Sequence, residues 1–125
     1  MTERIRIEEF TQDGKHFIYI DLSELKSNEE FIEQIRLIEP IIRKYPKGSL
    51  YTITNMGKTR FDAGTKAILV RYLEHNKPYV KYGAVVDFDG IMKMMGNSAI
   101  QLSKRDNLFF ALTKEQALEV LLQKE

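Results

Sequence analysis

The chain has 125 residues, 43% of them hydrophobic and 30% charged, with a formal net charge of +1. This composition is typical of a globular protein, and the length predicts one domain, 1–125, that buries roughly two-thirds of its unfolded surface. The near-neutral charge argues against nucleic-acid and anionic-membrane partners. The absence of cysteine excludes disulfides, thiol catalysis and thiolate metal sites. No stretch resembles a signal peptide or a membrane span of ~20 apolar residues, so we expect a cytoplasmic protein.

The first third of the chain predicts a hairpin and a helix. Asp13-Gly14 lies between two segments of alternating apolar residues, which is the pattern of a β-hairpin. Within 16–22 the alternation predicts a strand that helix covers on at least one side. Ser27 and Glu30 have the spacing of a capping box that begins a helix. Pro40 lies inside that helix and predicts a kink or a restart, because proline lacks the N–H of the helical hydrogen bond.

The centre of the chain, 49–76, combines a strand, a turn and a helix. Residues 50–54 are mostly β-branched or aromatic, as in a buried strand. The turn 55–65 follows, and Asp62 is placed to cap the free N–H groups at the start of the next helix. That helix is apolar around most of its girth, so it should lie against a sheet. Turns of this kind, between a strand and its helix, often hold the site of an open α/β fold.

The last third repeats the alternation of strands and helices. We expect a strand at 80–88, a third helix that starts at Asp87 or Asp89, and a strand at 107–112. Thr113 then opens a second capping box and the last helix. The predicted order is β-β-α-β-α-β-α-β-α, an α/β fold with a mixed, mostly parallel five-stranded sheet flanked by four helices.

This order, together with the turn Phe61-Asp62-Ala63-Gly64-Thr65, resembles the STAS superfamily, whose best-known members are bacterial anti-sigma-factor antagonists. In that family the turn reads Asp-Ser-Ser-Gly before an apolar helix. Asp62 stands at the aspartate position, Ala63 stands where the phosphorylated serine usually is, and Gly64 comes one residue early. The looser pattern is most similar to small bacterial proteins described as STAS/SEC14-like.

The resemblance implies a regulatory, non-enzymatic domain that contacts a protein partner or a second copy of itself. Alanine has no hydroxyl, so phosphoryl transfer at position 63 is chemically impossible. Two threonines of the turn, Thr59 and Thr65, remain as possible phosphoacceptors, although local hydrogen bonding is an alternative role for both. The predicted partner- or ligand-binding residues are Lys58, Thr59, Arg60, Asp62, Ala63 and Thr65, with Met92 and Met94 of the third helix.

Two other functions stay open from the sequence. Flexible methionines suit a greasy pocket, so an apolar or nucleotide-like ligand could bind between the second and third helices, against Ile68, Tyr72 and Met92. The segment Asp87-Phe88-Asp89-Gly90 resembles the nucleophile motif of haloacid dehalogenases, which implies a magnesium-dependent phosphatase. That motif normally lies on an early strand, and Ile91 replaces its usual threonine. We therefore expect no catalytic residues, no metal and no cofactor, with Asp87 and Asp89 as helix caps.

Overall fold

The computed structural model describes residues 6–60, 62–87 and 107–124. These ranges contain five strands and three helices: β1 (Ile7–Gln12), β2 (Lys15–Asp21), α1 (Asn28–Ile42), β3 (Leu50–Asn55), α2 (Ala63–Asn76), β4 (Val80–Val86), β5 (Leu108–Ala111) and α4 (Lys114–Leu122). The predicted α/β class is confirmed. The predicted third helix, with Asp89, Met92 and Met94, lies outside the described residues.

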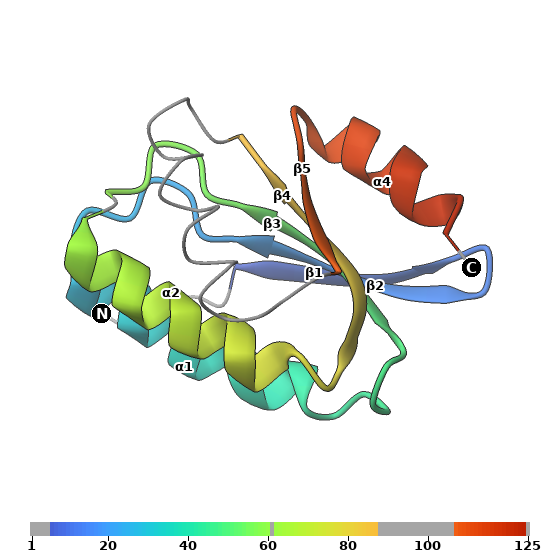
Figure 1. The fold of residues 1–125 in the computed structure, drawn as a ribbon, viewed down its shortest axis with the longest axis horizontal. Coiled ribbons are helices and arrows are strands. Elements are labelled where there is room, and N and C mark those ends of the chain that lie inside the picture. Colours follow the sequence, from blue (N-terminus) through green and yellow to red (C-terminus); the bar gives the residue numbers. More distant parts are fainter. Residues whose placement is uncertain (1–5, 61, 88–106, 125) are drawn as a thin grey trace.

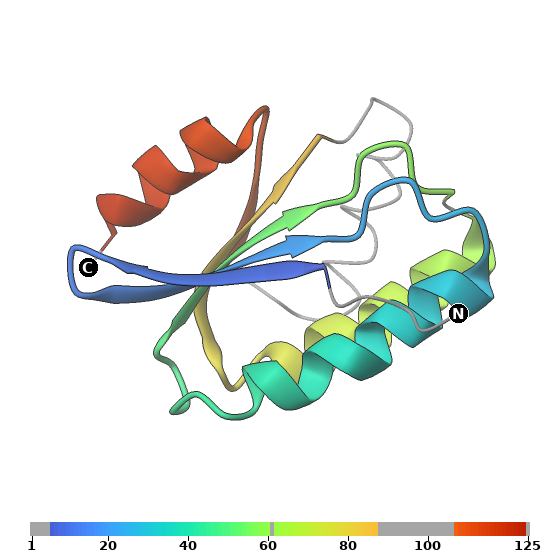
Figure 2. The same ribbon diagram turned by 180° about the vertical axis from the view of Figure 1, so that it is seen from behind.

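The sheet is mixed and mostly parallel, as predicted. Its strands lie side by side in chain order, β1-β2-β3-β4-β5. β1 runs antiparallel to β2, and every other neighbouring pair is parallel. Helices α1 and α2 lie together on one face of the sheet, and α4 lies on the other face (Figures 1 and 2). The carboxyl ends of β2, β3 and β4 consequently meet at one edge, next to the start of α2.

Each face of the sheet has its own core. The alternation predicted for 16–22 is confirmed, because Ile18 and Ile20 pack under α1 and α2 while Phe17 packs under α4. The face under α1 and α2 has the larger core, whose fully buried side chains include Ile18, Leu22, Phe31, Ile38, Ile42 and Leu50. Among the described residues, no helix has the length and apolar character needed to cross a membrane.

All three helices begin at the predicted capping residues. The Ser27 hydroxyl accepts a hydrogen bond from the Glu30 N–H at 3.2 Å, and the Thr113 hydroxyl accepts one from Gln116 at 3.1 Å. An Asp62 carboxylate oxygen accepts one from the Thr65 N–H at 3.0 Å. These side chains satisfy N–H groups that have no partner within the helix.

The predicted restart of the helix at Pro40 is wrong. Helix α1 continues through this residue and ends at Ile42. Pro40 lies in the last turn, where its missing N–H removes one hydrogen bond close to the natural end of the helix. The fully buried side chains of Ile38 and Ile42, on either side of it, hold this turn against the sheet.

Candidate functional site

The loops after β2, β3 and β4 are joined to each other beyond the ends of the strands. The Leu22 N–H donates to the Asn55 carbonyl at 2.8 Å, and the Met56 N–H donates to the Val86 carbonyl at 3.3 Å. One step further out, the Glu24 N–H donates to the Gly57 carbonyl at 2.8 Å. The parallel ladder therefore extends into the loops and sets their relative positions.

A pocket of about 400 Å³ lies between these three loops. We call it the edge pocket, and it is lined by Ser23, Glu24, Asn55, Gly57, Lys58 and Asp87. The Asn55 side chain supports its floor, because its amide group donates to the Tyr19 hydroxyl at 3.0 Å and its oxygen accepts from the Gly57 N–H at 2.8 Å. A Cβ at Gly57 would lie 3.2 Å from the Asp87 Cβ, so the loops approach closely here.

Three lining residues share an unusual backbone conformation. Glu24, Lys58 and Asp87 have φ angles of 58°, 57° and 64°, in the left-handed region. In the described part of the chain, the one other non-glycine residue with positive φ is Asp13, in the β1–β2 hairpin. The left-handed conformation costs roughly 1–2 kcal/mol for a residue with a Cβ. One such residue follows each of three successive parallel strands, and such strain is typical of functional sites.

The charged groups of these three residues lie at the surface without a partner among the described residues. Glu24, Lys58 and Asp87 are exposed, and their side chains form no ion pair or hydrogen bond with the described residues. Asp21, which ends β2, differs from them, because it forms an ion pair with Arg6 at 3.3 Å and accepts a hydrogen bond from the Ser23 N–H. The edge pocket therefore presents two carboxylates and one ammonium group that no other described residue pairs with.

Thr59 fixes the turn after β3 to the loop after β2. This residue is 4% exposed, and its hydroxyl donates to the Leu22 carbonyl and accepts from the Leu25 N–H at 3.2 Å. The Arg60 N–H also donates to the Leu25 carbonyl, at 2.9 Å. The Thr59 side chain therefore points into the protein, while its neighbours Lys58 and Arg60 are exposed.

Thr65 fixes the start of α2 to the start of α1. Its side chain is fully buried; the hydroxyl accepts from the Asp62 N–H at 3.2 Å and donates to the Asn28 side-chain oxygen at 2.7 Å. A Cβ at Gly64 would lie 2.7 Å from the Asn28 amide nitrogen, so a side chain here would force the Asn28 side chain to shift. The hydrogen bond from the Thr65 N–H is the main reason that the pKa of Asp62 lies below its ordinary value of 3.8.

The predicted site residues therefore separate into two groups. Lys58, Arg60 and Ala63 are exposed, and Arg60 forms an ion pair with Asp62 at 3.0 Å. Both predicted phosphoacceptors are buried, with their hydroxyls hydrogen-bonded to protein groups. Sequence reasoning missed Glu24 and Asn55, although both follow predicted parallel strands, whose carboxyl ends always meet at one edge.

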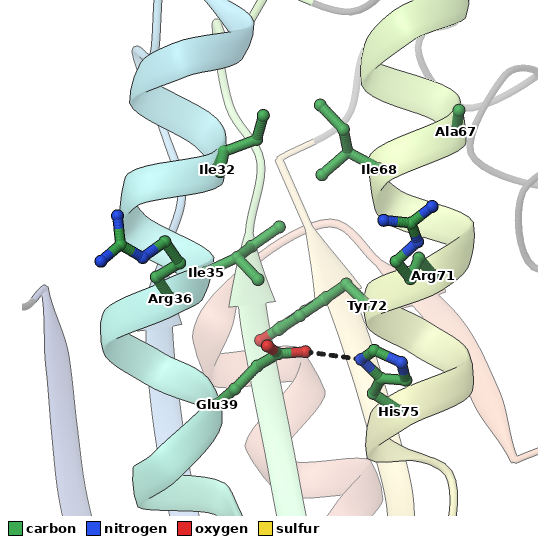
Figure 3. A pocket seen from close by; sticks show the side chains of 9 residues that line it. All are labelled: Ile32, Ile35, Arg36, Glu39, Ala67, Ile68, Arg71, Tyr72 and His75. Atoms are coloured by element: carbon green, nitrogen blue, oxygen red, sulfur yellow. Dashed lines mark hydrogen bonds and ion pairs between the residues drawn. The ribbon is translucent and has the colours of Figure 1, made fainter.

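A second hollow, which we call the interhelix groove, lies between α1 and α2 (Figure 3). Its volume is about 280 Å³, and it is lined by Ile32, Ile35, Arg36, Glu39, Ala67, Ile68, Arg71, Tyr72 and His75. The sequence left open a ligand site between the second and third helices, lined by Ile68, Tyr72 and Met92. In the structure Ile68 and Tyr72 line a groove shared with α1, and Met92 lies outside the described residues.

Asp21 and Asp87, which lie at the ends of strands, do not belong to a metal-binding cluster of described residues. No group of three or more His, Asp or Glu side chains is placed to hold a metal ion in the part of the chain that the structure describes. The left-handed backbone of Asp87 also differs from the extended backbone of the three N-caps, Ser27, Asp62 and Thr113. Asp89, the other aspartate of the dehalogenase-like segment, lies outside the described residues.

No model of a known protein family matches the chain, and no curated protein sequence matches it either. The STAS assignment therefore stays a prediction, based on the turn 61–65 and on the order of the elements. The features of the structure that bear on function are the geometry of the edge pocket and that of the turn.

Proposed function

We propose that this protein is a non-enzymatic, cytoplasmic interaction module resembling STAS domains, which binds a protein partner or a second copy of itself. The contact would be made by five residues of the carboxyl edge, which we call the turn surface: Glu24, Lys58, Arg60, Ala63 and Asp87. The observation that carries the proposal is the contrast within the turn, where exposed charged residues alternate with a fully hydrogen-bonded, buried threonine.

A fixed turn is favourable for recognition. Thr59 and Thr65 tie the turn to the loop after β2 and to α1, so little backbone freedom would be lost on binding. The charges of Glu24, Lys58 and Asp87, which pair with no described residue, would provide electrostatic complementarity, which contributes to specificity and to the association rate. Both features support a surface that meets another protein.

Ala63 gives the proposed contact a constitutive character. It is exposed at the first helical position of α2, where the resemblance to STAS domains places a phosphorylated serine. Because a methyl group cannot be phosphorylated, the charge at this position does not change with kinase or phosphatase activity. The partner would therefore recognise the turn surface without a phosphorylation step, and its binding would be controlled by concentration.

Photo-crosslinking tests this proposal directly. A photoreactive phenylalanine analogue at Ala63 should form a discrete covalent adduct in cells that contain the natural partners, and mass spectrometry would identify the second chain. The same analogue at Lys47, an exposed residue before β3 at the opposite edge of the sheet, should form none. An adduct of equal yield at both positions, or none at Ala63, would contradict the proposal.

Charge reversal provides the matched control. Lys58→Glu should reduce the adduct at Ala63 strongly, because Lys58 belongs to the turn surface and has no ion pair with the described residues. Lys47→Glu makes the same change in net charge far from the turn, so it should leave the adduct unchanged. Equal effects of the two reversals would indicate non-specific electrostatic attraction.

A further inference from the structure

The interhelix groove combines aliphatic walls with access to solvent. Ile32 and Ile35 extend from α1 toward α2, and Ile68 and Tyr72 extend from α2 toward α1 (Figure 3). Ile35 and Tyr72 are buried and form the floor, whereas Ile32 is 43% exposed. An exposed isoleucine beside other apolar side chains provides a surface that an apolar group could cover.

The charged residues of the groove are not equivalent. Glu39 lies 3.1 Å from the His75 Nδ1 and 3.9 Å from Arg43, so its carboxylate has partners on both helices. Arg36 forms an ion pair with Glu33 at 3.2 Å and extends away from the groove in Figure 3. Arg71 lines the groove and makes no ion pair or hydrogen bond with the described residues. Its guanidinium is thus the lining cation that a bound anion could use.

We infer that the interhelix groove binds a small apolar carboxylate, with its hydrocarbon part against Ile32, Ile35 and Ile68 and its carboxylate on Arg71. A guanidinium can hold a carboxylate through two parallel hydrogen bonds, which are stronger than hydrogen bonds between neutral groups. The volume of about 280 Å³ lies near the lower end of the range for ligand pockets, so the ligand is small. This inference does not depend on the turn surface, because the two sites share no residue.

The chemistry of the groove disfavours simpler ligands. A neutral apolar molecule would cover the isoleucines but would form no charge-assisted hydrogen bonds with the exposed Arg71 guanidinium. A short anion such as acetate would reach Arg71 but would bury almost no apolar surface. A molecule with a hydrocarbon chain and a carboxylate would contact both the isoleucines and Arg71, so we expect it to bind more tightly than a molecule with only one of these groups.

Octanoate is a suitable probe, with octanamide and acetate as controls. In the full chain labelled at isoleucine methyl groups, octanoate should shift the NMR signals of Ile32, Ile35 and Ile68. Isothermal titration should show octanamide binding about tenfold or more weakly than octanoate, because it lacks the charge that pairs with Arg71. Acetate should produce no shift at these methyl groups. Octanoate shifts confined to other isoleucines, such as Ile53 on the opposite face, would overturn the inference.

Matched variants separate the two parts of the site. Arg71→Gln should weaken octanoate binding about tenfold and leave octanamide binding unchanged. Arg36→Gln removes an arginine that lines the same groove but pairs with Glu33, so octanoate binding should stay as it is. Ile32→Gln should weaken both ligands alike. Equal losses in Arg71→Gln and Arg36→Gln, or no loss in Arg71→Gln, would overturn the assignment of the carboxylate to Arg71.

Discussion

The edge pocket and the interhelix groove are built in opposite ways. The edge pocket lies on loops, its lining residues are polar, charged or glycine, and three of the six have left-handed backbone. The groove lies between two regular helices, and its walls are mainly aliphatic. Hydrogen bonds of the Thr59 and Asn55 side chains fix the first, whereas packing against the sheet fixes the second. One small fold thus positions residues by backbone conformation at the carboxyl edge of its sheet and by side-chain packing on the face of the sheet.

The largest effect should come from the core beneath the groove. Ile38 is a fully buried residue of α1, so Ile38→Ala should lower the free energy of unfolding by about 2–5 kcal/mol through lost burial and a cavity. Ile32→Ala on the exposed wall should cost less than about 1 kcal/mol. Urea denaturation followed by circular dichroism would measure both. Similar losses in the two variants would mean that the groove wall belongs to the core.

The threonine contacts of the carboxyl edge should give the next largest effect. Thr65→Val removes the hydroxyl that joins Asp62 and Asn28, leaving buried polar groups unsatisfied, so we expect a loss of about 2 kcal/mol. Thr65→Ser keeps the hydroxyl and serves as the control, with a clearly smaller loss. The same urea titration applies. If the serine variant is destabilised as much as the valine variant, the methyl group contributes as much as the hydroxyl to holding the two helices together.

A substitution at a left-handed residue should increase the free energy of unfolding, whereas the substitutions above decrease it. Lys58→Gly should raise the free energy of unfolding by about 0.5–1 kcal/mol, because relief of the left-handed strain outweighs the extra entropy of glycine in the unfolded chain. Lys66→Gly, the same substitution inside α2, should instead lower it by about 1 kcal/mol. Thermal unfolding of both variants checks the pair. A destabilised Lys58→Gly would show that the conformation at Lys58 carries no strain.

The smallest effect concerns the pH dependence of the cap at Asp62. Its folded pKa lies below the ordinary value of 3.8, chiefly because of the hydrogen bond from the Thr65 N–H. The ionised carboxylate therefore stabilises the fold above about pH 4, and this contribution is lost as the pH falls through the folded pKa. Asp62→Asn keeps an oxygen acceptor without titrating, so its melting temperature should fall less steeply than that of the wild type between about pH 4 and about pH 2. If the melting temperatures of the wild type and Asp62→Asn fall equally with pH, Asp62 does not contribute to the loss of stability in acid.

Regular patterns were the predictable part of this protein. The alternation in 16–22 predicted its two faces, and the capping residues Ser27, Asp62 and Thr113 predicted three helix starts, because these signals are local in the chain. Pro40 misled the sequence reading, since its effect depends on how near it lies to the end of the helix. The left-handed conformations of Glu24 and Lys58 have no signal in sequence, because glycine and asparagine are the residues expected there. The burial of Thr59 and Thr65 likewise depends on the loop after β2 and on Asn28, which are distant in the chain.

The consecutive order of the strands also bears on how the protein folds. In the described sheet each strand pairs only with its neighbours in chain order, so no described strand has to be inserted between two that are already paired. The hairpin of β1 and β2 closes the shortest loop, and each later strand closes one loop containing a single crossover. The sheet can therefore grow from its amino-terminal edge while the chain is still being synthesised, with each new strand finding its template already formed.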